Sequence, residues 1–521
     1  MQLNPKSEYR NPKSAGWLAP QTPNPNVPNS KQFFAVSGRY CLENSDFEHL
    51  LLSFDGAQAP RVPCGDGELV EPFRISHFVL RIFGQLRRCC KIGTLLLLLA
   101  LLTSVIGCKP TRPAADSRRS RATPAPGSDA KPQFWVRVLL LNDAPACTLK
   151  FTSPFDVTGL TPPHPTCDFQ YLDAPIPVTV SAGKISIAGQ PFDANEVTVC
   201  PKEPHVFTLN GSDYRGTLKL ILDPNGGSFD AVNHIPLESY LAGVVGAEMP
   251  DYWEPQALKA QTIAARTYCL YIKKRFGADR AWDLSKTQAH QVYRGIDAES
   301  TQIWNAVNQT AGMVLVCKQA HPGPKGTPPE ALGADAADDI FPAYYSSTCG
   351  GHTENSKNVF GDSFEPLAGV PCPYCQDVAR PEFFFWPMTK LDAADVTEKL
   401  WQRYPRLKQL GQIMDITPAQ QSDYGGFHRL TKIELSGTTG DSDFLRAEDL
   451  RLTLDPTGTK LKSTICQIAK SGDEWVFSFG RGYGHGVGMC QCGAQAMARQ
   501  GKIADQILAY YYPNSHITRL Y

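Results

Sequence analysis

One stretch of sequence decides the fold, because it is where a strand-rich chain turns helical: Ile235-Pro236-Leu237-Glu238-Ser239-Tyr240-Leu241-Ala242-Gly243-Val244-Val245-Gly246-Ala247-Glu248-Met249-Pro250. Pro236 suits the first turn of a helix, where its missing N–H is not needed. Gly243 and Gly246 weaken that helix, so Glu248 is expected just past its end. Apolar neighbours would raise the pKa of this carboxyl by desolvation, as a general acid at neutral pH requires. The alternative is an ordinary surface glutamate at a helix end.

A second helix is expected directly downstream, beginning at Pro255 and ending at Gly277. Most of its residues are small or apolar, which predicts a helix that is buried on most sides. Lys259 and Arg266 are seven residues apart and therefore share one stripe of it. Cations on a buried helix need a partner. That partner is either a site carboxylate or anionic substrate, or a structural ion pair with an acidic residue such as Glu238 or Glu254.

The sequence upstream of these helices indicates strands. Short apolar runs separated by turn residues are typical of β-structure, and they occur at 134–141, 177–180, 184–187 and 218–222. From residue 231 onward, helical and strand patterns alternate to the end. We therefore predict an α+β fold, with a β-rich part over 133–230 and a mixed helix and strand core over 231–521.

Several further blocks follow the opening stretch in order along the chain: Ala257–Gln261, Ala264–Tyr268, Gln291–Gly295, Ser346–Glu354 and Gly482–Met489. Together they resemble the SpoIID/LytB family, and the resemblance runs from about Phe134 to Tyr521. It implies a SpoIID-type catalytic core acting on peptidoglycan. The family contains lytic transglycosylases that act on glycan strands without stem peptides, and amidase enhancers described as non-catalytic activators of a cell-wall amidase.

The resemblance implies a role for each candidate site residue. Glu248 would protonate the oxygen between N-acetylmuramic acid and N-acetylglucosamine, and the 6-hydroxyl of the muramic acid would attack C1 to give a 1,6-anhydro product. Lys259 and Arg266 would orient Glu248 or hold the lactyl carboxylate of the sugar. Gln291 and Tyr293 would bind sugar through amide hydrogen bonds and ring stacking. The sequence also leaves open a metalloamidase and a purely structural wall lipoprotein.

His485 lies between two glycines, Gly484 and Gly486, where a ligand can approach the backbone closely. We predict that it binds substrate, with a structural hydrogen bond as the alternative.

A second group of residues predicts a metal site. Cys349 and His352 form one closely spaced pair, and Cys372 and Cys375 form another. Three cysteines and one histidine are a standard closed tetrahedral zinc set, so we predict structural zinc. Disulfides are the alternative, because an exported chain meets oxidants. The sequence does not assign a role to Cys490 and Cys492, which stand where the family more often has Ser and Trp.

The first 132 residues carry an export pattern. Basic residues precede sixteen uncharged residues, 92–107, and Cys108 follows Gly107 as in a lipobox. Such a run is short for a membrane span and suits a signal peptide. We predict residues 79–107 as a lipoprotein signal, Cys108 as the lipidated residue and residues 108–132 as a flexible tether. The alternative is a short membrane anchor with an incidental cysteine. Residues 1–78 are expected to be unfolded or to precede the true start, for which Val79 is the candidate.

Composition limits the partners. Lys plus Arg and Asp plus Glu number 51 each. The chain therefore has no excess of positive charge that would favour binding to nucleic acid. The predicted partners are peptidoglycan strands, a cell-wall amidase and the membrane. The lipid on the protein would anchor it in the membrane. We expect the protein to face the cell wall, in the periplasm or at the outer membrane.

Overall fold

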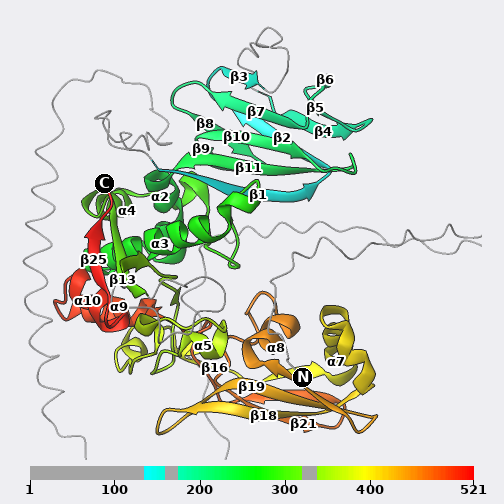
Figure 1. Cartoon of the computed structure of the whole chain (residues 1–521), viewed down its shortest axis with the longest axis vertical. Coiled ribbons are helices and arrows are strands. Elements are labelled where there is room, and N and C mark those ends of the chain that lie inside the picture. Colours follow the sequence, from blue (N-terminus) through cyan, green and yellow to red (C-terminus); the bar gives the residue numbers. More distant parts are fainter. Residues whose placement is uncertain (1–133, 159–173, 320–336) are drawn as a thin grey trace, which may run out of the picture. The chain divides into compact units, whose positions relative to one another are not determined.

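The computed structural model describes residues 134–158, 174–319 and 337–521, which Figure 1 shows in colour. The predicted signal peptide at 79–107, the lipidated Cys108 and the tether at 108–132 lie outside the described residues, as does the segment 1–78. Within the described ranges, no helix combines the length and the apolar character that crossing a membrane would need.

The first half of the described chain is built from two six-stranded sheets. One has the strand order β12-β1-β11-β10-β7-β3 and the other β6-β5-β4-β2-β8-β9. Their alternate residues are buried in one shared hydrophobic core, as period-two side-chain alternation requires. The strands are β1 (Trp135–Ala144), β2 (Ala146–Phe151), β3 (Phe155–Thr158), β4 (Ile176–Ser181), β5 (Lys184–Ile187), β6 (Gln190–Phe192), β7 (Glu196–Pro201), β8 (Val206–Leu209), β9 (Ser212–Arg215), β10 (Thr217–Leu222), β11 (Phe229–Pro236) and β12 (Leu284–Ser285).

β1 and β11 connect these sheets to the helices. They pair antiparallel, with Trp135 opposite Pro236, and lie side by side in Figure 1. Leu237 follows β11 directly, and its N–H donates a 2.7 Å hydrogen bond to the carbonyl of Phe134. The helix that carries Glu248 therefore begins beside Phe134, the first residue that the structure describes.

The helices pack beside this sheet and share its core. They are α2 (Leu237–Glu248), α3 (Pro255–Phe276), α4 (Thr301–Gln309), α9 (Gln491–Arg499) and α10 (Ala504–Tyr511). Gly243 and Gly246 do not end α2, which continues to Glu248. Their role is close packing: a Cβ on Gly243 would lie 2.5 Å from the Tyr293 ring, and one on Gly246 would lie 1.9 Å from the carbonyl oxygen of Ala298.

The last strand returns to the start of the domain. β25 (His516–Arg519) pairs with β13 (Met313–Gln319), which also pairs with β14 (Ala337–Ile340). The Tyr521 ring stacks on Phe134 with centroids 4.9 Å apart, and its hydroxyl donates to Glu238. The two ends of the described chain therefore meet at the base of α2.

Residues 386–477 contain a second, separate hydrophobic cluster. Two three-stranded sheets, β17-β22-β21 and β18-β19-β20, form it with two helices. The elements are β17 (Thr389–Asp392), α7 (Ala393–Arg403), η7 (Pro405–Leu410), β18 (Ile413–Asp423), β19 (His428–Gly437), β20 (Ser442–Arg446), α8 (Ala447–Leu454), β21 (Gln467–Ser471) and β22 (Glu474–Ser478). The sequence pattern predicts a core over 231–521 but does not indicate this second cluster.

Short elements complete the described chain. They are η2 (Gly277–Asp279), η3 (Gly295–Ala298), β15 (Tyr345–Ser346), α5 (Ser356–Val359), η5 (Glu365–Leu367), η6 (Cys375–Asp377), α6 (Pro381–Phe384), β16 (Phe385–Trp386), β23 (Gly480–Arg481) and β24 (Met489–Cys490). The predicted α+β class is confirmed: strands fill the first half of the described chain, and helices and strands mix after residue 236.

Candidate functional site

Glu248 is the last residue of α2, and two donors hold its carboxylate. Oε1 accepts a 2.9 Å hydrogen bond from the backbone N–H of Val292. Oε2 lies 3.5 Å from Nε2 of Gln491, the first residue of α9. The residue is only partly exposed. Its carboxyl therefore has fixed neighbours on the protein side and retains some access to solvent.

Burial raises the pKa of Glu248 above its ordinary value, because the ionised carboxylate is poorly solvated there. The hydrogen bonds from Val292 and Gln491 and the charge of Arg294 oppose part of this shift. A carboxyl whose pKa is raised keeps its proton closer to neutral pH, so this group can act as an acid.

The two cations of α3 have different surroundings. Arg266 is fully buried and forms a two-pronged ion pair with Glu238, at 2.9 and 2.6 Å, and it also donates to the carbonyl of Met313. This is the structural ion pair that the sequence left open. Lys259 is half-buried, and in the part of the chain that the structure describes it has no hydrogen-bond or ion-pair partner.

Gln291 and Tyr293 lie inside the protein. Both are buried. The Gln291 amide donates to the carbonyl of Ala265 and to the hydroxyl of Tyr345, and it accepts from Tyr240. The Tyr293 hydroxyl donates to the side chain of Asn233. Their polar atoms thus contact the protein, and the Tyr293 ring that we expected to stack on sugar packs in the core.

His485 is held by its own loop. Its Nδ1 accepts a 3.0 Å hydrogen bond from the N–H of Val487, and its ring lies edge-on to Phe360 at 5.1 Å. Burial lowers the pKa of His485 to about 4, so the ring is neutral at pH 7. These contacts match the structural alternative for this residue.

Four buried cysteines form one cluster: Cys349, Cys372, Cys375 and Cys490, whose sulfurs all lie within 4.8 Å of one another. The structure therefore brings together three of the four predicted metal ligands and adds Cys490 from the far end of the chain. The Cys349 and Cys375 sulfurs are 3.8 Å apart. A zinc ion with bonds of about 2.3 Å to four sulfurs places them about 3.8 Å apart. The separation of Cys349 and Cys375 matches this value, and all four sulfurs lie within 4.8 Å of one another.

The cysteines of the cluster influence one another's pKa. The pKa of Cys372 lies far below its ordinary value, because Cys349, Cys375 and Cys490 donate hydrogen bonds to its sulfur. Burial raises the pKa of Cys349 and Cys490. The four buried sulfurs therefore form a site that could hold a metal ion.

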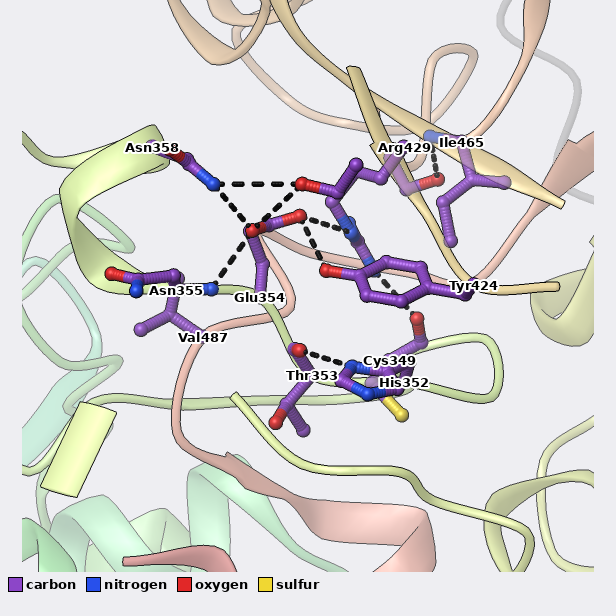
Figure 2. Close-up of polar contacts among 12 residues, drawn as sticks. Cys349, His352, Thr353, Glu354, Asn355, Asn358, Tyr424, Arg429, Ile465 and Val487 are labelled. Carbon is purple, nitrogen blue, oxygen red and sulfur yellow. Dashed lines mark hydrogen bonds and ion pairs between the residues drawn. The ribbon is translucent and has the colours of Figure 1, made fainter. Parts of the chain in front are cut away.

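His352 is not part of this cluster. Its Nδ1 donates a 2.7 Å hydrogen bond to the carbonyl of Thr353, and its ring stacks on Tyr424 with centroids 4.0 Å apart. Figure 2 shows His352 below Tyr424, in the loop that follows Cys349. The Cys349-Gly-Gly-His352 spacing suggested two ligands in one turn. However, Gly350 and Gly351 both have positive φ, which changes the direction of the chain between Cys349 and His352.

The same loop carries a buried acid. Glu354 accepts hydrogen bonds from the hydroxyl of Tyr424 at 2.7 Å and from the amide of Asn358 at 2.8 Å. Arg429 lies 3.8 Å from this carboxylate and donates to the carbonyl of Cys349 at 2.6 Å (Figure 2). Arg429 and Tyr424 belong to the second hydrophobic part of the chain, so these contacts join that part to the cysteine loop.

Sequence reasoning missed Gln491 and Cys490 as site residues. Gln491 sits beside Glu248, although 243 residues separate them. The sequence feature that could have indicated them is the family block Gly482–Met489, because Cys490 and Gln491 directly follow it.

The segment that carries Glu248 has counterparts in known proteins. Residues 225–317, which include α2 and α3, match the family model described as stage II sporulation protein (SpoIID). An uncharacterized protein from Brachyspira hyodysenteriae is 31% identical over 306 residues, covering 59% of this chain and 72% of the relative. Stage II sporulation protein D from Bacillus subtilis is 30% identical over 292 residues, covering 55% and 76%.

The amidase enhancer of Bacillus subtilis is also similar. It is 26% identical over 376 residues, covering 65% of this chain and 49% of the relative. The matched family model spans the acid-bearing helix, and two relatives at 30% identity or more are matched over most of their length. The chain therefore belongs to the SpoIID/LytB family.

Proposed function

We propose that this protein is an exported peptidoglycan lytic transglycosylase in which Glu248 is the general acid. The observation that carries the proposal is the state of Glu248: a partly accessible carboxyl whose pKa is raised by burial. It lies at the end of a helix that two glycines pack tightly against its neighbours.

The reaction balances with one carboxyl. Glu248 donates its proton to the oxygen between N-acetylmuramic acid and N-acetylglucosamine, and the bond from C1 of the muramic acid to that oxygen breaks. The 6-hydroxyl of the same muramic acid attacks C1, and its proton passes to the Glu248 carboxylate. Because no water is added, no second carboxyl is needed to activate one, in contrast to most glycosidases.

Lys259 is the cation that we assign to substrate. It is half-buried and has no partner among the described residues, so it can pair with the lactyl carboxylate of the sugar. Arg266, Gln291, Tyr293 and His485 are assigned structural roles, because each is engaged with the protein itself.

We further propose that the four-cysteine cluster binds zinc as a structural ion. Four protein ligands would leave no open coordination position, so the ion would join the 349 loop, the 372–375 turn and the start of α9 without taking part in cleavage. The same closed site argues against a metalloamidase.

The test is to incubate the purified protein with glycan strands stripped of peptides and to look for 1,6-anhydro ends by mass spectrometry. Glu248→Gln keeps the shape and removes the proton, so it should abolish these products while glycan binding remains. Cleavage by the Glu248→Gln variant at the wild-type rate would exclude Glu248 as the acid.

Amidase enhancement is the second candidate, supported by the similarity to a relative that bears this name. It predicts no anhydro ends from the wild-type protein, but faster release of stem peptides when a cell-wall amidase is added. Running both assays on the same preparation separates the two functions.

A further inference from the structure

The start of α9 touches both the cysteine cluster and the Glu248 loop. Cys490 is the residue before the helix, and Gln491, its first residue, lies 3.5 Å from Oε2 of Glu248. One turn later, Oε1 of Gln495 accepts a 2.9 Å hydrogen bond from the backbone N–H of Glu254. Residues four apart on a helix share a face, so one face of α9 contacts both ends of the loop between α2 and α3.

The cysteine cluster fixes where this face lies. β24, which contains Cys490, pairs parallel with β15, and the N–H of Cys349 points to the Cys490 sulfur at 3.2 Å. The N–H of Cys492 donates to the carbonyl of Ser347 at 3.0 Å. A Cβ on Gly493 would lie 2.7 Å from the Cys372 sulfur. The first turn of α9 therefore has no room to shift against the cluster.

We infer that Gln491 is a positioning residue for Glu248, and that the four-cysteine cluster holds Gln491 in place through the first turn of α9. The inference rests on the proposed role of Glu248 as the acid. It adds a second function to the cluster, which would then orient the reacting carboxyl as well as stabilise the fold.

The physical effect of Gln491 is directional. Its amide N–H and that of Val292 approach different oxygens of Glu248, which fixes the plane of the carboxyl. Both donors favour the ionised form and so limit how far burial raises the pKa of Glu248. Among the residues that the structure describes, the other charged or titratable groups that influence Glu248 are Arg294 and Tyr345, and neither belongs to α9.

The test compares two glutamines of one helix. Gln491→Met keeps the side-chain length and removes the donor, and Gln495→Met makes the same change where the partner is a backbone N–H. The pKa of Glu248 is read from the carboxyl carbon signal of protein labelled with ¹³C-glutamate, assigned by its loss in Glu248→Gln. This readout does not require any cleavage activity.

Gln491→Met should raise the pKa of Glu248, and Gln495→Met should leave it unchanged. In the glycan assay, Gln491→Met should cleave about 10- to 100-fold more slowly, as expected for a misplaced reacting group. The alkaline limb of its pH profile should also move to higher pH. Gln491→Glu should also raise the pKa of Glu248, because it places a second carboxylate beside it. This variant replaces Gln491→Met in the test if the Met variant does not fold.

The cluster is tested with wild-type protein. Treatment with a chelator should raise the pKa of Glu248, as Gln491→Met does. An unchanged pKa in the Gln491 variants, or an equal shift in Gln495→Met, would overturn the inference. A shifted pKa in a protein that makes no anhydro ends would keep Gln491 as a positioning residue and reject only the transglycosylase.

Discussion

At the scale of single residues, burial decides which candidates remain available to substrate. The family blocks contain Glu248, Lys259, Arg266 and Gln291 close together in sequence, and sequence alone could not separate them. In the structure Arg266 has 0% exposure and Gln291 1%, whereas Glu248 and Lys259 keep some exposure. The sequence pattern predicted a raised pKa for Glu248, and burial does raise it, but the partner of each polar group depends on contacts across the fold.

The first prediction concerns Arg266. Replacing it with Met would leave Glu238 without its ion-pair partner, so Arg266→Met should lower the free energy of unfolding by about 3 kcal/mol, measured by urea denaturation. The cleavage rate per folded molecule should stay within about twofold of wild type, since about tenfold would correspond to 1.4 kcal/mol at the transition state. Glu238→Gln in the same chain should recover part of the lost stability. A tenfold loss of rate in fully folded Arg266→Met would return this residue to the active site.

The second prediction uses the raised pKa of Glu248. A carboxyl whose folded-state pKa exceeds its unfolded value stabilises the fold at low pH, and this contribution is lost as pH rises through the folded pKa. Glu248→Gln has no such titration. Its stability relative to wild type should therefore increase with pH through this range and level off above it, as measured by thermal unfolding in a pH series. Glu254→Gln, at the exposed end of the same loop, is the matched control, and a difference that is flat with pH would contradict the prediction.

At the scale of elements, local patterns located the helices but not the contacts between distant segments. Pro255 and Gly277 bound the second helix as expected, since α3 spans Pro255–Phe276 and Gly277 caps it. The fourth member of the cysteine cluster could not be found this way, because Cys490 lies 141 residues from Cys349. Short spacing favoured His352, and only the paired strands β15 and β24 reveal that Cys490 takes the fourth position.

The third prediction follows from this cluster. The purified protein should carry about one equivalent of zinc, held by four sulfurs. Cys490→Ser should lose most of the zinc and be strongly destabilised, because structural zinc contributes directly to folding. His352→Ala should keep the metal, since its ring faces Thr353 and Tyr424 instead. Metal content by mass spectrometry decides the matter: loss of zinc in His352→Ala would restore the histidine as a ligand.

At the scale of the whole molecule, the described chain has two hydrophobic clusters joined by polar contacts. The α+β class followed from strand and helix patterns, but the division into two clusters did not. The alternation of apolar residues along a strand does not show whether that strand packs into the first hydrophobic core or forms a second one. The link through Glu354, Tyr424 and Arg429 is also invisible in sequence, because Tyr424 is 70 residues from its partner.

The fourth prediction concerns attachment to the membrane, on the segment outside the described residues. Labelled palmitate should enter the wild-type protein in cells but not Cys108→Ala, which should also keep its signal segment. Cys147→Ala removes a buried cysteine of the described domain and should leave the labelling unchanged. Equal label in wild type and Cys108→Ala would reject the lipoprotein assignment.

The meeting of Phe134 with the base of α2 has a mechanical consequence. The carbonyl of Phe134 accepts from Leu237, and the Phe134 ring lies on Tyr521. A pull on the chain from upstream therefore enters the domain at the first turn of the helix whose last residue is Glu248. Tension would load this hydrogen bond, the contact of Phe134 with Tyr521 and the β1 pairing behind them first, so the first turn of α2 would bear part of the force.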